Sequence, residues 1–288
     1  MKTHLILSGG GVDGFQALGA LKYMQQRDLF RDVSHIIGVS VGSLLGLALL
    51  CVPDLDVIQE IFIESNSKSV PTFNVKHLLY NCSLFEQNHY VSELIKYVKK
   101  VFEQENITFK DLFEKTQKTF TVVGANISTG KPEYFSVHNT PDMNIETAIT
   151  ISCAIPFVFP FVKHNNCVYI DGCFFEHFPV NYALACDNVT PNNIIGVNIC
   201  RNLDVPACTE NLTFTAYASL LMSMVWSKHA KPYNDEVLEK NILCLSDTKT
   251  NQYLFLPIQK QVIVDMIESG YMKCEAFFNA SKDISHEM

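Results

Sequence analysis

Residues 36–52 read IIGVSVGSLLGLALLCV, an apolar run whose only polar side chains are those of Ser40 and Ser43. The residues up to position 39 predict a buried strand, and Val41–Cys51 predict a helix that is apolar on every side and therefore buried. A membrane-spanning helix needs about 20 consecutive apolar residues. This run is shorter, and three glycines interrupt it. We therefore expect a strand, a tight turn and a helix within a folded core rather than a membrane span.

The junction of this strand and helix, residues 38–42, reads GVSVG and fits the pattern G-x-S-x-G. A serine hydroxyl acts as a nucleophile only when a nearby base takes its proton. A sharp strand-to-helix turn exposes the hydroxyl, and Gly38 and Gly42 leave space for that turn. The pattern thus indicates Ser40 as a nucleophile at a helix N-terminus, where backbone N–H groups favour negative charge. The alternative is that Ser40 or Ser43 only caps the helix.

A glycine-rich segment, SGGGVDG at residues 8–14, also follows a predicted strand and precedes a predicted helix. Its spacing fits the dinucleotide-binding pattern G-x-G-x-x-G, which also requires an acidic residue at the end of the next strand. Asp32 lies before that strand instead, and this argues against a nucleotide cofactor. Consecutive glycines let backbone N–H groups converge on an anion. With a nucleophilic serine elsewhere, Gly9, Gly10 and Gly11 are candidates for an oxyanion hole; the alternative is a turn that only packs helix on strand.

A third pattern lies in the sequence VYIDGCFF at residues 168–175. Asp-Gly between two β-prone runs is a strong signal for a type I′ hairpin turn, and the local sequence favours that interpretation. An aspartate in a turn can also project its carboxylate into a site. A hairpin and a catalytic role for Asp171 are therefore compatible.

Strands and helices alternate along the rest of the chain. Strands are predicted at residues 4–7, 34–39, 120–126, 168–170 and 193–199, and helices at about 15–27, 41–51, 55–64, 91–104, 213–226 and 261–278. This alternation predicts an α/β fold with a largely parallel central sheet sandwiched between helices. Because no linker or repeat divides the chain, we expect a single domain over residues 1–288, with its core motifs in 4–180 and a closing helical segment at 210–288.

The three patterns, in this order, resemble those of the patatin-like phospholipases. The intervening segments VVGANISTG (122–130) and SCAIP (152–156), and prolines 160 and 179, agree with that family as well. The resemblance implies a patatin-like fold, with Ser40 as nucleophile and Asp171 as its partner in a Ser–Asp dyad. It also implies that the glycine-rich loop forms the oxyanion hole, and that the motif glycines support the site: Gly9, Gly10 and Gly11 in the loop, and Gly38, Gly42 and Gly172 around the dyad.

Three positions depart from the family's pattern. The glycine-rich loop usually carries a basic residue where this chain has Asp13. A carboxylate facing the site would oppose an anionic intermediate, whereas one facing solvent would matter little. Cys173 replaces the glycine or alanine that ends the D-G-[GA] motif, and residues 176–178 (EHF) replace a polar run. None of these changes removes Ser40 or Asp171.

The resemblance implies a serine lipid acyl hydrolase of the phospholipase A type, a carboxylic-ester hydrolase acting on phospholipids or related lipids. In this scheme Asp171 accepts the Ser40 proton and Ser40 attacks the ester carbonyl. A free aspartate has a pKa of about 3.9, so the dyad depends on geometry and on burial that raises this pKa. The scheme requires no metal and no organic cofactor. The expected partners are a lipid substrate and, transiently, a membrane or micelle surface.

Two other hypotheses remain open at this point. A Ser-His-Asp hydrolase requires a histidine base, and His177, His229 and His286 all follow Asp171 in the chain. The second hypothesis is a catalytically weak or inactive patatin-like module that binds lipid or protein, which Asp13 suggests.

Composition excludes several classes of protein. The 288 residues carry a formal net charge of −8, which argues against nucleic acid as a partner and against docking on anionic membranes by bulk charge. The ten cysteines show no C-x-x-C pair and no close Cys/His spacing, so a zinc site is not expected. The N-terminus lacks the features of a signal peptide. We therefore expect a cytoplasmic protein that is peripheral to membranes, with reduced and mostly buried cysteines.

Overall fold

A computed structural model describes residues 1–68, 79–80, 82–200, 214–228, 232–245 and 258–286. Within these residues, eight strands form one mixed sheet in the order β5-β6-β3-β2-β1-β7-β8, with β4 also pairing with β3. The strands are β1 (His4–Leu7), β2 (His35–Val39), β3 (Thr119–Asn126), β4 (Lys131–Ser136), β5 (Val162–His164), β6 (Cys167–Asp171), β7 (Ile194–Ile199) and β8 (Ile242–Leu245). The five strands from β3 to β8 along this order run parallel, whereas β4 and β6 pair antiparallel to β3.

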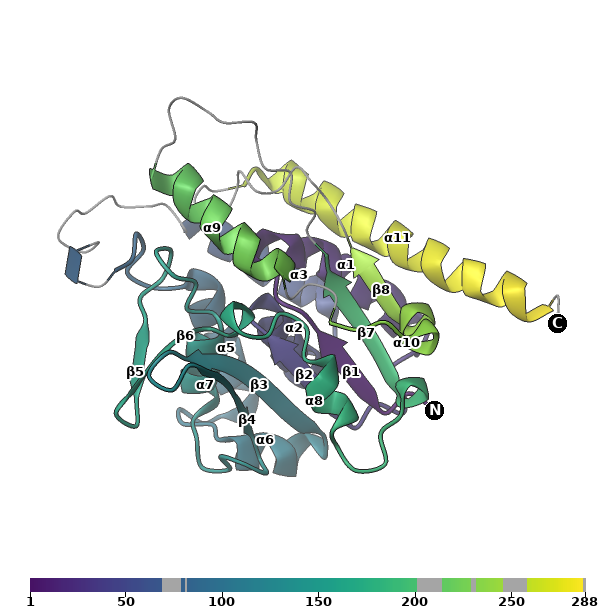
Figure 1. Ribbon diagram of the computed structural model, residues 1–288, viewed down its shortest axis with the longest axis horizontal. Coiled ribbons are helices and arrows are strands. Elements are labelled where there is room, and N and C mark those ends of the chain that lie inside the picture. Colours follow the sequence, from purple (N-terminus) through teal and green to yellow (C-terminus); the bar gives the residue numbers. More distant parts are fainter. Residues whose placement is uncertain (69–78, 81, 201–213, 229–231, 246–257, 287–288) are drawn as a thin grey trace.

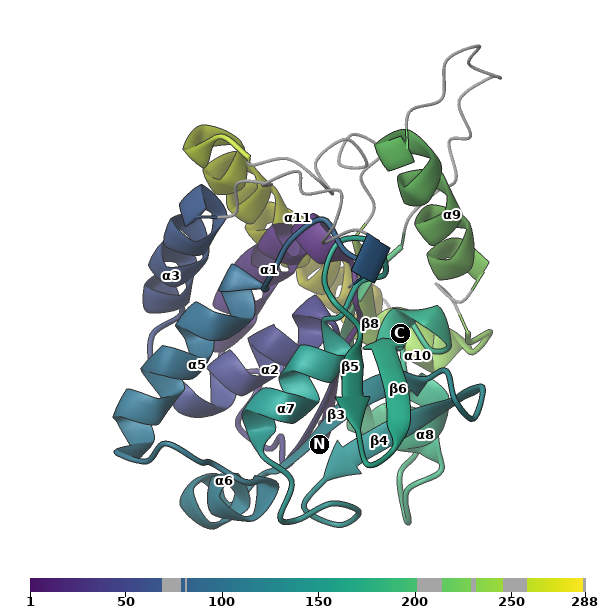
Figure 2. The same ribbon diagram turned by 90° about the vertical axis from the view of Figure 1, so that its left-hand side faces the viewer.

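The sheet lies between two layers of helices (Figures 1 and 2), and alternate residues of its central strands pack against one layer or the other. On one face, Leu5, Leu7 and Ile36 share a core with α1, α2, α3, α5 and α11. On the other face, Ile6 and Ile37 pack with side chains of α8, α9 and α10. The helices are α1 (Gly14–Gln26), α2 (Val41–Cys51), α3 (Leu55–Lys68), α5 (His89–Phe102), α6 (Phe109–Thr116), α7 (Ile145–Ser152), α8 (Val180–Leu184), α9 (Phe214–Lys228), α10 (Glu236–Asn241) and α11 (Lys260–His286).

This arrangement confirms the predicted fold class, a largely parallel sheet between helices. The ends of the predicted elements differ from those observed by one or two residues, except that α3 and α11 extend further toward the C-terminus. Residue 213 of the predicted helix 213–226 lies outside the described residues. Residues 36–52 form β2, a turn and α2 as predicted. Among the residues that the structure describes, no helix is both long and apolar enough to cross a bilayer.

The hairpin predicted at Asp171-Gly172 is wrong. β6 ends at Asp171, and Gly172–Phe174 continue as a 3-10 helix rather than a returning strand. The hairpin lies one strand earlier, where Asn165 and Asn166 join β5 to β6 with φ angles of 47° and 60°. Positive φ at both central residues is what a type I′ turn requires, and asparagine tolerates it. Gly172 has a different role, because a Cβ atom there would lie 2.4 Å from the carbonyl oxygen of Val123 on β3.

Candidate active site

Ser40 occupies the single-residue turn between β2 and α2. Its backbone has φ 52° and ψ −125°, a region that non-glycine residues rarely adopt. The Ser40 N–H donates to the Ser152 hydroxyl at 2.9 Å, and that hydroxyl donates to the carbonyl oxygen of Val123 at 2.6 Å. Ser152, the last residue of α7, thus connects the turn at Ser40 to β3. Ser152 begins the SCAIP segment named above, but the sequence did not indicate its contact with the turn at Ser40.

The Ser40 side chain makes no hydrogen bond that caps α2. Instead, its hydroxyl donates to Oδ2 of Asp171 at 2.5 Å. The second carboxylate oxygen, Oδ1, accepts the backbone N–H of Cys173 at 2.9 Å. Ser40 and Asp171 are 3% and 1% exposed. The structure therefore brings together the two side chains that the sequence indicated, within a buried hydrogen bond, and the alternative of Ser40 as a simple helix cap does not describe its side chain.

Burial changes the basicity of this carboxylate. Loss of hydration raises the pKa of Asp171 from 3.8 to about 6, against the opposing effect of the hydrogen bonds from Ser40 and Cys173. A carboxylate with a pKa near neutrality is a stronger base than a free aspartate and is still ionised at pH 7. The arrangement can therefore accept a proton from the serine hydroxyl.

The glycine-rich loop approaches Ser40 at very short range. A Cβ atom on Gly9 would lie 1.9 Å from Sγ of Cys173 and 3.2 Å from Cβ of Ser40. The Gly9 N–H already donates to the backbone carbonyl of His177 at 3.2 Å. Gly10 and Gly11 follow with φ angles of 155° and 56°, and Gly11 lines the same pocket as Ser40. The three loop glycines thus differ: the Gly9 N–H is already hydrogen-bonded within the protein, whereas Gly11 lines the pocket.

The glycines of the other two motifs permit close backbone crossings. A Cβ atom on Gly38 would lie 2.6 Å from the carbonyl oxygen of Gly42, and one on Gly42 would lie 2.4 Å from that of Leu7. Contacts below 3.0 Å with backbone atoms leave no room for a side chain. β1, the turn and α2 therefore pack more closely than any other residue type allows.

Asp13 neither lines the pocket around Ser40 nor faces solvent. Its side chain is 2% exposed, at the N-terminus of α1. It is not among the described residues that line the pocket around Ser40, although its neighbours Val12 and Gly14 are. Although Asp13 replaces the basic residue that is usual in the family, its carboxylate does not line the pocket.

Two thiols lie beside the carboxylate. Burial and the nearby Asp171 raise the pKa of Cys173 well above its usual range, and the same two causes raise that of Cys153. Both thiols are therefore neutral at pH 7, and neither competes with Ser40 as a nucleophile.

Of the three histidines considered as a base, the structure describes the side chain of His177 alone, and this side chain is hydrogen-bonded to a backbone carbonyl. His177 is buried, and its Nε2 donates to the carbonyl oxygen of Ile199 at 2.8 Å. His229 and the side chain of His286 lie outside the described residues. The hydroxyl of Ser40 is directed at a carboxylate rather than at an imidazole.

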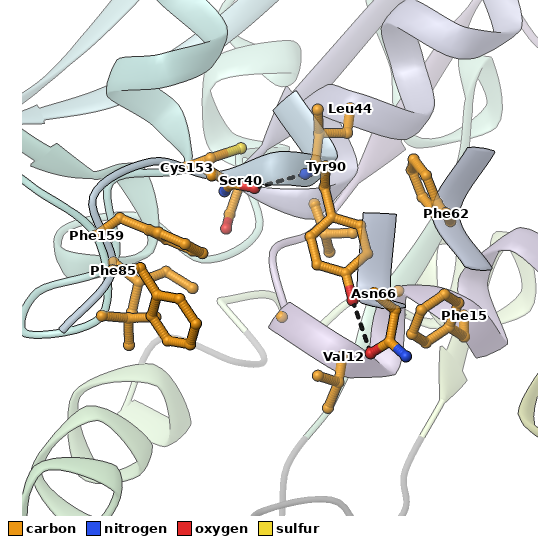
Figure 3. Close-up of a pocket in the computed structure, with 16 residues that line it drawn as sticks. Val12, Phe15, Ser40, Leu44, Phe62, Asn66, Phe85, Tyr90, Cys153 and Phe159 are labelled. Carbon is orange, nitrogen blue, oxygen red and sulfur yellow. Dashed lines mark hydrogen bonds between the residues drawn. The ribbon is translucent and has the colours of Figure 1, made fainter. Parts of the chain in front are cut away.

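A mostly apolar pocket of about 100 Å³ opens at Ser40. Figure 3 shows Ser40 between two groups of aromatic side chains: Phe85 and Phe159 on one side, and Phe15, Phe62 and Tyr90 on the other. At the end away from Ser40, Asn66 accepts a hydrogen bond from the Tyr90 hydroxyl at 3.2 Å. These aromatic residues come from α1, α3, α5 and two loops, and sequence analysis identified none of them. The shape and lining suit an extended apolar group.

The chain is similar to a known protein family and to two lipid-hydrolysing relatives named below. The family model described as "Patatin-like phospholipase" matches residues 5–184. "Probable lipid hydrolase 463L" of Invertebrate iridescent virus 6 is 33% identical over 192 residues, which cover 64% of each chain. "Triacylglycerol lipase 5" of Saccharomyces cerevisiae is 28% identical over 176 residues, 55% of this chain and 22% of the lipase. The chain thus spans less than two thirds of the length of both relatives.

The solved structure of VipD from Legionella pneumophila has the same fold. The two superpose with a TM-score of 0.63 at 14% sequence identity, over 97% of this chain and 67% of VipD. At this level of identity the likeness concerns the fold alone.

The packing of the glycine-rich loop against Cys173 gives a first prediction. Gly9→Ala should lower the free energy of unfolding by about 1–3 kcal/mol, because the new methyl group overlaps Sγ of Cys173. Cys173→Ala removes that atom and should cost about 1 kcal/mol or less. The double variant should then be more stable than Gly9→Ala alone. Urea unfolding of the four proteins measures this coupling, and additive losses would contradict it.

Proposed function

The chain belongs to the patatin-like phospholipase family, and on that premise we propose that it is a serine lipid acyl hydrolase of the phospholipase A type, with Ser40 and Asp171 as its catalytic dyad. The observation that carries the proposal is the 2.5 Å hydrogen bond between the Ser40 hydroxyl and the Asp171 carboxylate. Both groups are buried, and the bond joins the ends of β2 and β6.

The reaction proceeds in two steps. Asp171 takes the proton from Ser40 Oγ as this oxygen bonds to the ester carbonyl carbon, and the carbonyl oxygen becomes an oxyanion. As the intermediate collapses, the bond to the alcohol breaks and Asp171 returns the proton to the leaving oxygen. Water activated by the same carboxylate then attacks the acyl-enzyme, which releases the fatty acid and restores Ser40. The mechanism uses no metal and no organic cofactor.

The oxyanion is assigned to the glycine-rich loop, through the backbone N–H of Gly11, together with the N-terminus of α2. Gly11 lines the pocket beside Ser40, and helix N-termini stabilise developing negative charge. Gly9 was expected to contribute its amide as well, but that N–H is bonded to the His177 carbonyl. Its part in the proposal is to let the loop lie against Ser40 and Cys173.

The proposed substrate is an acyl ester of a phospholipid or a related lipid. The aromatic lining of the pocket accepts an acyl chain, and Ser40 lies where the ester carbon of such a chain would reach. The names of the viral and yeast relatives, a probable lipid hydrolase and a triacylglycerol lipase, support lipid esters as the class. The alternative of an inactive binding module rested on Asp13, whose side chain does not line this pocket.

The helix α9 offers a route to a lipid surface. Its inner residues Ala218 and Met222 belong to the same apolar cluster as the pocket residue Phe85. On its outer side, Tyr217 and Met224 are 50% and 52% exposed and lie seven residues, or about two turns, apart on one face. The helix contains no acidic residue. We propose that this face contacts zwitterionic or neutral lipid, because the net charge of −8 opposes an anionic surface.

We also propose that residues 1–288 form one domain. β1, from the start of the chain, lies in the same sheet as β8, and α11 packs along α1. Gly19 and Gly270 permit that contact, since a Cβ atom on either would lie 1.9 Å from a backbone carbonyl oxygen of the other helix.

The dyad predicts two inactive variants. Ser40→Ala removes the nucleophile and Asp171→Asn removes the base, so each should lower fatty-acid release from mixed phospholipids by at least about 1,000-fold. Circular dichroism and urea unfolding should show that both variants still fold. Comparable activity in either variant would overturn the assignment.

Two controls distinguish the other hypotheses. A fluorophosphonate should label the wild type but not Ser40→Ala, and a folded wild type that is never labelled would favour a binding module. Separate alanine substitutions at His177, His229 and His286 should each reduce the rate about tenfold or less. A near-complete loss from one of them would indicate a histidine base instead.

The raised pKa of Asp171 predicts a pH dependence. Because the base works only when ionised, kcat/KM should fall about tenfold per pH unit below pH 6. The folded state holds this proton more tightly than the unfolded state, so stability from Asp171 is greatest below pH 4 and is lost as pH rises toward 6. Asp171→Asn should therefore gain stability relative to wild type across that window. A kcat/KM profile and urea unfolding from pH 4 to 8 measure both effects, and a flat profile would contradict this role for Asp171.

If the exposed face of α9 contacts lipid, substitutions on it should slow hydrolysis of vesicles but not of a soluble ester. Tyr217→Gln and Met224→Gln should each lower hydrolysis of long-chain phosphatidylcholine vesicles at least about threefold, and a soluble short-chain ester should be hydrolysed at the wild-type rate. Met272→Gln is the matched control, since Met272 is 67% exposed on α11. Full vesicle activity in the double variant, or a parallel loss on the soluble ester, would show that α9 does not contact the lipid.

A further inference from the structure

Two histidines lie side by side at the end of the sheet opposite Ser40. His4 begins β1 and His35 begins β2, and the two residues are register partners in this parallel pair. Their ring centroids are 5.0 Å apart. Both side chains are on the same face as Ile6 and Ile37, which is the face that α8 covers.

A cysteine completes the cluster on that face. Cys186 lies just after α8 and is partly exposed. One ligand atom from each of His4, His35 and Cys186 lies within 4.8 Å of the other two. We propose that these three side chains bind a divalent zinc-like cation, in a structural site that joins the starts of β1 and β2 to the segment after α8.

The surroundings of the histidines fit this role. The Thr3 hydroxyl is hydrogen-bonded to Nδ1 of His4 at 2.9 Å, and the Thr121 hydroxyl to Nε2 of His35 at 2.8 Å. In metal sites, a hydrogen bond to one ring nitrogen commonly fixes the orientation of the imidazole and leaves the other nitrogen for the metal. Here the remaining nitrogens are Nε2 of His4 and Nδ1 of His35.

The donor set indicates which ion would bind. Two imidazole nitrogens and one thiolate suit Zn²⁺ better than the hard cations Mg²⁺ and Ca²⁺, which prefer oxygen. Ligand atoms around a tetrahedral zinc lie about 3.3–3.7 Å apart, so ligand atoms at the 4.8 Å limit would approach one another by about 1 Å on binding. Cys186 is partly exposed, which leaves its side chain room to move toward the two imidazoles. Water is the fourth ligand.

The site is separate from the proposed catalytic dyad. His35 starts β2 and Ser40 follows its end, so the whole strand lies between them. Bound metal would therefore stabilise the fold without contacting the reacting groups. The spacing of cysteines and histidines in the sequence argued against zinc, because the three ligands come from β1, β2 and the segment after α8 and meet only in the folded chain.

Metal titration of the purified full-length chain tests the inference. Wild type should bind one Co²⁺ with a thiolate-to-cobalt charge-transfer band, and saturating Zn²⁺ should raise its thermal midpoint by at least about 3 °C over that in EDTA. Cys186→Ser and His35→Gln should each lose both responses. Cys82→Ser, at an exposed cysteine elsewhere, should keep them.

The midpoints in EDTA show whether each variant is folded before its response to metal is compared. Hydrolysis by the wild type should be the same with Zn²⁺ and with EDTA. If wild type binds no Co²⁺ through sulfur, or if Cys186→Ser and His35→Gln respond to metal as wild type does, the site does not exist. The failure of either response leaves the proposed esterase function untouched, since that function is measured through Ser40.

Discussion

The geometry of the site depends on the strained turn at Ser40. A positive φ at a non-glycine residue costs about 1–3 kcal/mol and persists only where the surroundings enforce it. Here the enforcement comes from Ser152, whose hydroxyl links the Ser40 N–H to the Val123 carbonyl, and from Gly38 and Gly42, which leave no room for relaxation. The strain directs the hydroxyl away from its ordinary capping position and toward Asp171. The hydrogen bond of the dyad is thus a product of backbone packing.

The same close packing determines the chemistry of the carboxylate. Asp171 is 1% exposed, and the loss of hydration raises its pKa to about 6. Ionised Asp171 is therefore costly for stability but effective as a base. A more open site would be more stable at neutral pH, yet its carboxylate would bind a proton too weakly to accept one from a serine hydroxyl.

The sequence predicted the elements that carry local signals. Residues 36–52 specify β2, the turn and α2 because apolar periodicity and glycine spacing act over a few neighbouring residues. The prediction failed where two local signals competed: Asp171-Gly172 has hairpin chemistry, but the turn formed at Asn165 and Asn166, since a tertiary contact between Gly172 and β3 decided the path. The strand β8 and the aromatic pocket walls were missed, because each is defined by partners far away in the chain. The strands β4 and β5, which pair with their neighbours along the chain, were missed as well.

Long-range assembly also explains why the two ends of β2 differ in character. In a parallel sheet the carboxyl ends of the strands open into loops and helix N-termini, where N–H groups favour anions and intermediates. Ser40 lies at that end. At the amino ends, side chains of adjacent strands are brought into register, and His4 and His35 meet there because β1 and β2 start on the same level. Chemistry that requires positive potential therefore belongs at one end of β2, and the pairing of two histidines at the other end follows from strand register.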